Sequence, residues 1–197
     1  MQTPDLILAS ASPRRQELLA QLGIYCTVVV AGIPEQHLAG ETPEAYVQRI
    51  AAEKSLAVQS LSENQLPVLA ADTEVVLDGQ IFGKPGNQSH AVEMLGRLSG
   101  REHTVLSAVS LRQGGQHWNA LSVSTVRFRI ITADEMAAYW LTGEPCDKAG
   151  AYAIQGLGAV FVERLMGSFS GVMGLPLHET AELLGRINLA PLGRSQR

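Results

Sequence analysis

The sequence predicts an α/β fold built on a mixed, twisted sheet with flanking helices. Strand-like and helix-like segments alternate over the first 60 residues, which is the order typical of parallel strands joined by helical crossovers. Further along, Asp78-Gly79 and Gly114-Gly115 each separate two strand-like runs, and such pairs are typical of antiparallel hairpins. Both strand directions are therefore expected within one sheet.

The first part of the chain supplies alternating strands and helices. Ser12-Pro13 is a helix start signal, because proline at the first helical position needs no backbone N–H, and Gly23 ends that helix. Thr42-Pro43-Glu44 begins the second helix in the same way. The expected elements are strands 5–9, 25–30 and 68–77 and helices 13–22 and 43–60.

The remainder of the chain supplies two hairpins and three helices. In the first of these helices, the apolar residues recur at helical spacing on one face, and Ser99-Gly100 closes the segment. A Gly-rich stretch lies between the last two helices. The expected elements are strands 81–82, 103–112, 118–129 and 159–165 and helices 88–98, 133–141 and 176–187.

Size and composition bound the function. A chain of 197 residues suits one domain, and we expect residues 1–190 to form it, with 191–197 as a frayed C-terminal tail. The net charge of −4 disfavours a surface for nucleic acid or anionic lipid, and the apolar runs fall short of the ~20 residues that span a bilayer. Two distant cysteines and no basic leader favour the cytoplasm over an oxidising compartment.

Two arginines stand in the opening turn of the first helix, within Ser10-Ala11-Ser12-Pro13-Arg14-Arg15. Cations are normally disfavoured there, because a helix N-terminus already carries partial positive charge. A bound anion would reverse this effect, since backbone N–H, hydroxyl and guanidinium groups all donate to phosphate oxygens. The turn is thus a candidate triphosphate site, and a solvated basic turn or a pairing with Glu17 is the alternative.

A lysine interrupts the apolar stripe of the second helix. Val47, Ile50, Ala51 and Val58 share one face at 3.6-residue spacing, and Lys54 falls on that face. A buried ammonium is unfavourable unless it meets an anion or extends to water. Lys54 is therefore either a ligand-binding residue or a lysine whose charged end reaches solvent.

An acid stands in an otherwise apolar strand, in Ala70-Ala71-Asp72-Thr73, and Gly83-Lys84-Pro85 follows after a hairpin. A buried carboxylate near lysines can bind a divalent cation or take a proton from a nucleophilic water. Asp72 could instead cap a turn or form a structural ion pair with Lys84. The motif alone leaves both interpretations open.

The densest cluster of polar groups lies within 143–156, Gly-Glu-Pro-Cys-Asp-Lys-Ala-Gly-Ala-Tyr-Ala-Ile-Gln-Gly. Its glycines and alanines allow a ligand to approach the backbone closely, which favours a functional loop over a structural turn. The chain lacks a P-loop, a Gly-x-Ser-x-Gly elbow and a His-Glu-x-x-His motif. Among the scattered histidines, we expect His103 and His178 at the surface.

Together these motifs resemble the Maf proteins, nucleotide pyrophosphatases also associated with septum formation. The resemblance covers almost the whole chain, and its motifs in order are Leu8 to Leu19, Ala52-Glu53-Lys54, Ala71-Asp72-Thr73, Gly83-Lys84-Pro85, Leu98-Ser99-Gly100, Ser124 to Phe128, 143–156 and Gly174 to Leu177. Departures from the family pattern are Gly86-Asn87, Ser107, Phe169 and Met173, which concern the rim of the site.

The resemblance implies a cleft between two lobes, a fold similar to the inosine triphosphate pyrophosphatases, and a homodimer. By the same resemblance Asp72 is the catalytic base, helped by Lys54 and Lys84. The residues implied to contact substrate are Ser10, Arg14, Arg15, Thr73 and Gln155. Asp72 and Glu35 would hold a divalent metal cation, Mg²⁺ or Mn²⁺.

The implied reaction is hydrolysis of a nucleoside triphosphate to the monophosphate and pyrophosphate. Arg14, Thr73 and Gln155 resemble the branch of the family that acts on dTTP and UTP, modified pyrimidine nucleotides included, rather than the branch that acts on 7-methyl-GTP. The alternatives are a non-catalytic nucleotide-binding regulator of septum formation and a nucleic-acid-binding protein. The expected partner is a small-molecule nucleotide, with no nucleic acid and no membrane.

Overall fold

The computed structural model of the chain describes residues 3–30, 32–61 and 66–192. Its strands are β1 Leu6–Leu8, β2 Cys26–Val28, β3 Val68–Leu77, β4 Gln80–Phe82, β5 Glu102–Gln113, β6 Gln116–Phe128 and β7 Val162–Met166. Its α-helices are α1 Pro13–Gln21, α2 Pro43–Leu61, α3 Gln88–Leu98, α4 Ala133–Leu141, α5 Phe169–Met173 and α6 Leu177–Gly185. Its 3₁₀ helices are η1 Glu144–Asp147, η2 Ala149–Ala151 and η3 Leu157–Phe161.

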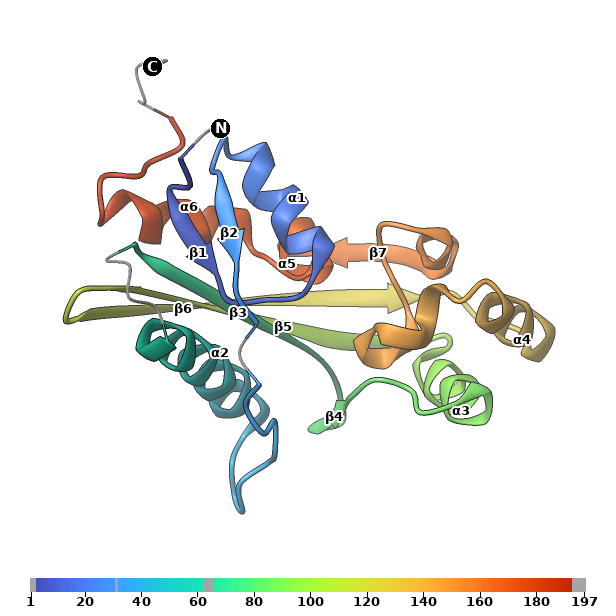
Figure 1. Ribbon diagram of the computed structural model, residues 1–197. Coiled ribbons are helices and arrows are strands. Elements are labelled where there is room, and N and C mark those ends of the chain that lie inside the picture. The colour runs from blue at the N-terminus through green and yellow to red at the C-terminus, as the bar shows by residue number, and fades with distance from the viewer. Residues whose placement is uncertain (1–2, 31, 62–65, 193–197) are drawn as a thin grey trace.

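The described strands form one mixed sheet in the order β2-β1-β3-β5-β6-β7, and β4 pairs with β3 outside this path. β1 pairs in parallel with both β2 and β3. All other pairs are antiparallel, and the long β5–β6 hairpin crosses the whole of Figure 1. The predicted mixed sheet is therefore confirmed.

Helices cover both faces of the sheet. α2 packs on β3 and β5, where Val47 and Ala51 contact Leu106 and Ala108. α5 and α6 pack on the opposite face, against β5 and β6 (Figure 1). α3 and α4 lie side by side at one end of the sheet, next to the 3₁₀ helices.

Two regions differ from the sequence prediction. Residues 157–161 form η3, so that the strand expected at 159–165 begins only at Val162. The short helices η1, η2 and α5 were not predicted, because three to five residues are too few to show a helical hydrophobic period.

His103 is not at the surface but 3% exposed within the core, in edge-to-face contact with Phe128 and Tyr152. His178 is exposed as predicted. The predicted C-terminal tail falls mostly outside the described residues, since only 191–192 of 191–197 are described. Within the described residues, we find no helix with the length and apolar character needed to span a membrane.

Candidate active site

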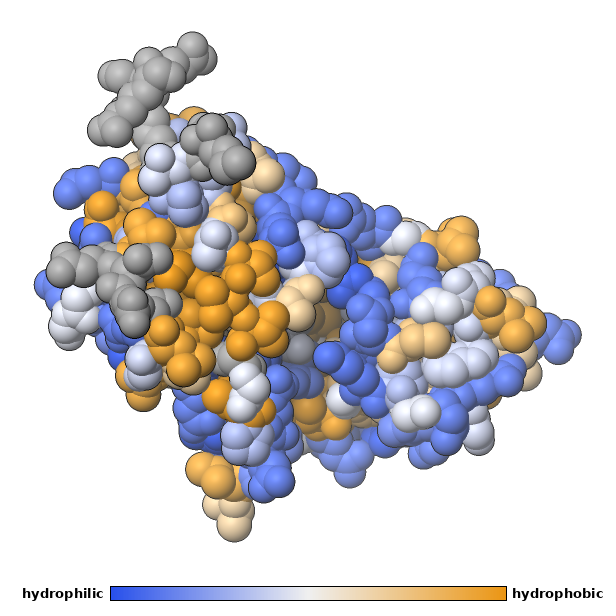
Figure 2. Space-filling view, viewed as in Figure 1, coloured by the Kyte–Doolittle hydropathy of each residue, from blue (hydrophilic) through white to orange (hydrophobic). Residues whose placement is uncertain are grey.

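A cavity of about 610 Å³ opens where the C-terminal end of β1, the N-terminus of α1 and the middle of β3 meet. Figure 2 shows a hollow at this position, near the middle of the molecule. The cavity brings together all nine residues predicted for the site, although they come from segments spread over most of the chain. They are Ser10, Arg14, Arg15, Glu35, Lys54, Asp72, Thr73, Lys84 and Gln155.

The N-terminus of α1 presents donors to this cavity. Ser12 occupies the N-cap position but makes no side-chain capping bond, so its hydroxyl does not accept from the amides of the first turn. Arg15 donates from Nε to the Gly174 carbonyl oxygen at 2.8 Å and from Nη1 to Ser10 Oγ at 3.0 Å. Nη2 also donates to Thr73 Oγ1 at 3.5 Å. All three acceptors are neutral, and within the described residues Arg15 makes no ion pair with a carboxylate. Burial lowers the pKa of Arg15, and the field of Asp72 opposes that shift.

Lys54 lies between two carboxylates. Its Nζ is 2.7 Å from Asp72 Oδ1 and 3.0 Å from Glu35 Oε1, and its side chain is 13% exposed. The apolar stripe of α2 turns Lys54 toward β3, because residues at i, i+4 and i+7 share a helix face. The lysine thus meets anions rather than solvent, and Asp72 pairs with Lys54 rather than with Lys84.

Asp72 is 4% exposed, and its second oxygen, Oδ2, has no hydrogen-bond partner among the residues that the structure describes. Burial raises the pKa of Asp72, while Lys54 and Arg15 act in the opposite direction. Strand β3 fixes the residue opposite Ala108 of β5, on the sheet face that α2 covers. An unpartnered carboxylate oxygen that lines a cavity can accept a proton from water or bind a cation.

Glu74 is a site residue that the sequence reasoning missed. It lines the cavity, is 8% exposed, and its Oε2 also lacks a hydrogen-bond partner. Burial together with the charges of Asp72 and Glu35 raises the pKa of Glu74 to about 8. The sequence feature that could have identified Glu74 is the two-residue period of a strand, which places Asp72 and Glu74 on the same face.

Thr73 points to the opposite face of β3 from Asp72. Its Oγ1 lies 3.0 Å from Ser107 Oγ and 3.4 Å from the Gly174 carbonyl oxygen. Ser107 also donates to the Gly171 carbonyl oxygen at 2.6 Å. The serine at position 107 thus connects Thr73 to α5, so that the cavity is lined from both faces of β3.

Further cations lie at the mouth of the cavity. Among the residues described, neither Arg14 nor Lys84 makes an ion pair within 4 Å, so Arg14 does not pair with Glu17. Lys148, which the sequence reasoning did not single out, lines the same mouth and pairs with Asp147. The lining therefore holds five cationic side chains and four carboxyl groups in a chain whose net charge is −4.

Gln155 lies on a loop that one tyrosine–glutamate pair holds in place. Tyr139 donates to Glu144 Oε1 at 2.6 Å and accepts from the Ala153 amide at 3.1 Å. Glu144 also accepts from the amides of Leu157 and Gly158 at 2.9 and 3.0 Å. The backbone on both sides of Gln155 is thus fixed, and the 143–156 segment combines a structural and a cavity-lining role.

The carboxyl groups of the cavity offer oxygen atoms of the kind that Mg²⁺ and Mn²⁺ prefer. Asp72 and Glu74 each have an oxygen without a hydrogen-bond partner. Within the described part of the chain, however, no group of three or more His, Cys, Asp or Glu side chains is arranged to hold a metal ion by itself. The described side chains thus offer oxygen atoms of a suitable kind but do not by themselves form a complete metal site.

Comparisons with known proteins identify similar sequences and a similar structure. A family model described as Maf-like protein matches residues 5–187. A dTTP/UTP pyrophosphatase of Methylococcus capsulatus is 61% identical over 96% of this chain and 95% of its own length. A dTTP/UTP pyrophosphatase of Escherichia coli is 50% identical over 93% of each chain. The solved structure of a nucleoside-triphosphatase / dITP/XTP pyrophosphatase from Mycobacterium abscessus aligns over 96% of this chain with a TM-score of 0.42 and 16% identity.

Proposed function

The chain belongs to the Maf family, and from that premise we propose that it is a nucleoside triphosphate pyrophosphatase that hydrolyses dTTP and UTP to the monophosphate and pyrophosphate. The observation that carries the proposal is the excess of cations in one cavity of an otherwise acidic protein. A triphosphate complements the exposed Lys84, the Arg14–Arg15 turn and the amides of the α1 N-terminus.

Asp72 is the proposed general base. Asp72 lines the cavity, and among the described residues its Oδ2 has no hydrogen-bond partner. This oxygen is the one proposed to accept a proton from a water that attacks the α-phosphorus in line. Lys54 holds the other oxygen of Asp72 and thereby fixes the direction in which Oδ2 points. Lys84 and Arg15 stabilise the charge on the phosphate oxygens, because reactions of this type depend chiefly on positioning and electrostatics.

We propose a divalent cation, Mg²⁺ or Mn²⁺, as the cofactor, held by Asp72 and Glu35. Phosphate oxygens of the nucleotide would complete its ligands, because within the described residues no group of three or more His, Cys, Asp or Glu side chains is arranged to hold a metal ion alone. When bound, the cation neutralises phosphate charge and acts as a Lewis acid on the reacting phosphate.

The proposed preference for pyrimidines depends on Gln155, Thr73 and Arg14. The Gln155 amide carries both donors and an acceptor and can therefore match the edge of a pyrimidine base. Its loop is fixed on both sides, which favours discrimination between bases, because a rigid polar group cannot adapt to the wrong partner.

We also propose a homodimer in the cytoplasm. Tyr25, Val28 and Val30 are 39–57% exposed on and beside the edge strand β2, and Figure 2 shows hydrophobic side chains gathered on this part of the surface. Such a surface suits a second copy of the chain. Cys26 and Cys146 are both free thiols, which suits a reducing compartment. Light scattering coupled to size-exclusion chromatography, on the wild type and on Val28→Glu, tests the dimer.

The experiment that tests the function is a screen for pyrophosphate release from the common and several modified nucleoside triphosphates, with and without Mg²⁺ or Mn²⁺. We expect dTTP and UTP to be hydrolysed fastest and only with metal present. A profile confined to purines would contradict the pyrimidine assignment. Tight binding of dTTP without release of pyrophosphate would instead favour the non-catalytic regulator.

A further inference from the structure

The segment 32–42, which carries Glu35, forms neither helix nor strand. It runs from the end of β2 to the start of α2 and projects at the lower edge of Figure 1. The Glu35 side chain is 48% exposed, yet it reaches Lys54 at 3.0 Å. An exposed loop loses considerable conformational entropy when it is ordered, so specific contacts must hold Glu35 at the cavity.

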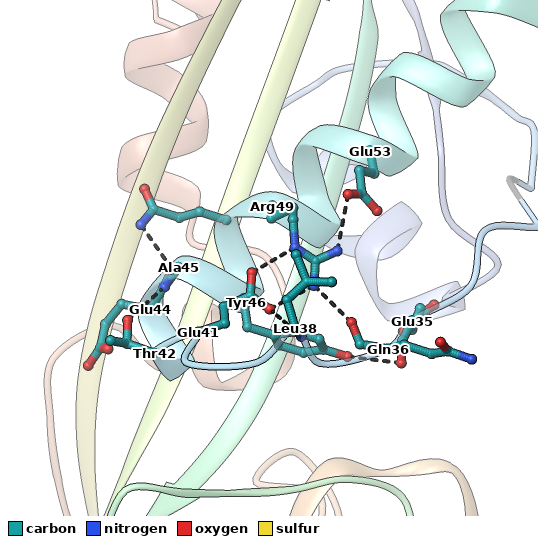
Figure 3. Close-up of polar contacts among 11 residues, drawn as sticks. Glu35, Gln36, Leu38, Glu41, Thr42, Glu44, Ala45, Tyr46, Arg49 and Glu53 are labelled. Atoms are coloured by element: carbon teal, nitrogen blue, oxygen red, sulfur yellow. Dashed lines mark hydrogen bonds and ion pairs between the residues drawn. The ribbon is translucent and has the colours of Figure 1, made fainter.

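Arg49 of α2 makes the densest set of such contacts, as Figure 3 shows. Its Nε and Nη2 donate to the two oxygens of Glu41 at 2.6 and 2.8 Å. Nη2 also donates to the Gln36 carbonyl oxygen at 2.9 Å, and Nη1 donates to Glu53 Oε1 at 3.0 Å. One guanidinium therefore binds the loop at two positions, Gln36 and Glu41, and also the next turn of its own helix.

Tyr46, one turn earlier on α2, adds a second attachment. Its hydroxyl donates to the Glu35 carbonyl oxygen at 3.4 Å, and its ring stacks on His37 with the centroids 3.9 Å apart. Among the residues that the structure describes, the hydrogen bonds from 32–37 to the rest of the chain are those to Tyr46 and Arg49. The same helix thus holds the Glu35 backbone through Tyr46 and its carboxylate through Lys54.

The Arg49–Glu41 pair has the geometry of a strong contact. A lysine could not replace this bidentate fork, because an ammonium group cannot place two fixed N–H groups on one carboxylate. The hydrogen bond from Arg49 lowers the pKa of Glu41 to about 2, so the pair stays ionised from mildly acidic to alkaline pH. Glu41 Oε2 also accepts from the Leu38 amide at 3.2 Å, which extends the attachment into the loop.

We propose that Arg49 is a positioning residue, which holds the loop 32–42 on α2 through Glu41 and Gln36 so that Glu35 stays beside Lys54 and Asp72. The inference rests on the proposed function, since Glu35 affects turnover only if the cavity handles a metal and a triphosphate. Arg49 itself does not line the cavity. Its effect on catalysis is therefore indirect, and the contacts to Glu41 and Gln36 are the proposed route.

Hydrogen–deuterium exchange of the protein without nucleotide tests the anchor directly. Arg49→Met keeps a long side chain on α2 but removes the fork, and Glu41→Gln weakens the same pair from the loop side. Both should speed exchange in peptides from 32–42, the Leu38 amide included, while β3 stays protected. Arg101→Met is the control, because Arg101 donates from Nη2 to both carboxylate oxygens of Asp78 at a distant hairpin. Exchange in 32–42 that is the same in Arg49→Met and wild type would overturn the proposal.

Kinetics test the link to Glu35. In both loop variants we expect the half-saturating Mg²⁺ concentration for dTTP hydrolysis to rise about 10-fold, the usual effect of losing a residue that orients a metal ligand. A Glu35→Gln variant should show a similar rise, and the double variant Arg49→Met/Glu35→Gln should be no worse than Glu35→Gln alone. Effects that multiply in the double variant would show that Arg49 does not act through Glu35.

Different results would contradict the proposed function and the proposed role of Arg49. A wild-type protein that releases no pyrophosphate from any triphosphate would overturn the proposed function and the inference with it. An active wild type whose Arg49→Met variant keeps the same Mg²⁺ requirement would overturn the inference alone. Arg101→Met should match the wild type both in hydrogen–deuterium exchange of 32–42 and in its Mg²⁺ requirement.

Discussion

Lys54 Nζ lies 2.7 Å from Asp72 Oδ1, which joins the only charged residue on the inner stripe of α2 to the acid at the centre of β3. The contact leaves Asp72 Oδ2 without a partner. It thus divides the carboxylate into one oxygen that is held and one that is available to react.

Asp72→Asn should lower kcat for dTTP by about 10²-fold or more, because an amide cannot accept the proton that a general base takes up. Pyrophosphate release at saturating dTTP and Mg²⁺ measures the change. Thermal unfolding of the same sample checks that the variant is folded. A variant with nearly full turnover would rule out Asp72 as the base.

Arg14→Gln should weaken nucleotide binding without weakening the fold. Arg14 makes no ion pair within the described chain, and its charge lowers the pKa of Arg15, so its removal should change the free energy of unfolding by less than about 0.5 kcal/mol. The KM for dTTP should rise about 10-fold, because a hydrogen bond to a charged group contributes about 1.5 kcal/mol or more. A large loss of stability with unchanged KM would assign Arg14 a structural role.

Gly156→Ala should disrupt the support of Gln155. A Cβ at this position would lie 2.1 Å from Glu144 Oε2, so the carboxylate must leave the amides of Leu157 and Gly158. We expect a loss of about 1–3 kcal/mol in unfolding free energy, together with weaker discrimination between dTTP and purine triphosphates. Gly115→Ala is the matched control, since nothing lies within 4 Å of its added Cβ. Equal effects of the two substitutions would contradict the proposed support.

His103 should make the fold sensitive to acid. Burial lowers its pKa to about 4 from an ordinary value of 6.5, so between these pH values the unfolded chain binds more protons than the folded one. Stability is therefore complete above about pH 6.5 and falls by up to about 3 kcal/mol as the pH approaches 4. Urea unfolding at pH 7.5 and pH 5 should show a larger difference in the wild type than in His103→Gln. The same difference in both proteins would exclude His103 as the cause.

Local patterns in the sequence predicted the long elements and the individual site residues. The hydrophobic period of helix 43–60 placed Lys54 on the inward face, and the acid within the apolar run of strand 68–77 singled out Asp72. Both lie in the cavity as expected. The pairing of Asp72 with Lys54 rather than Lys84 was not predictable in this way, because it depends on how α2 packs across β3 and not on either segment alone.

Other features of the structure were not predicted from the sequence, each for a different physical reason. Glu74 and His103 follow the two-residue period of their strands. His103 was expected at the surface because it is polar, and Glu74 was not singled out beside Asp72. The Glu144 contacts escaped because they bridge 13 and 14 residues through an irregular loop with no period at all.

The alternation of Asp72 and Thr73 across β3 also limits which changes in chain length the protein can tolerate. A single residue deleted between Val68 and Ala71 would shift the pairing with β5 and exchange the two faces, so that the hydroxyl of Thr73 would meet Lys54 and the carboxylate of Glu74 would meet Ser107. Length variation among relatives should therefore accumulate in the surface turns and stay out of this strand.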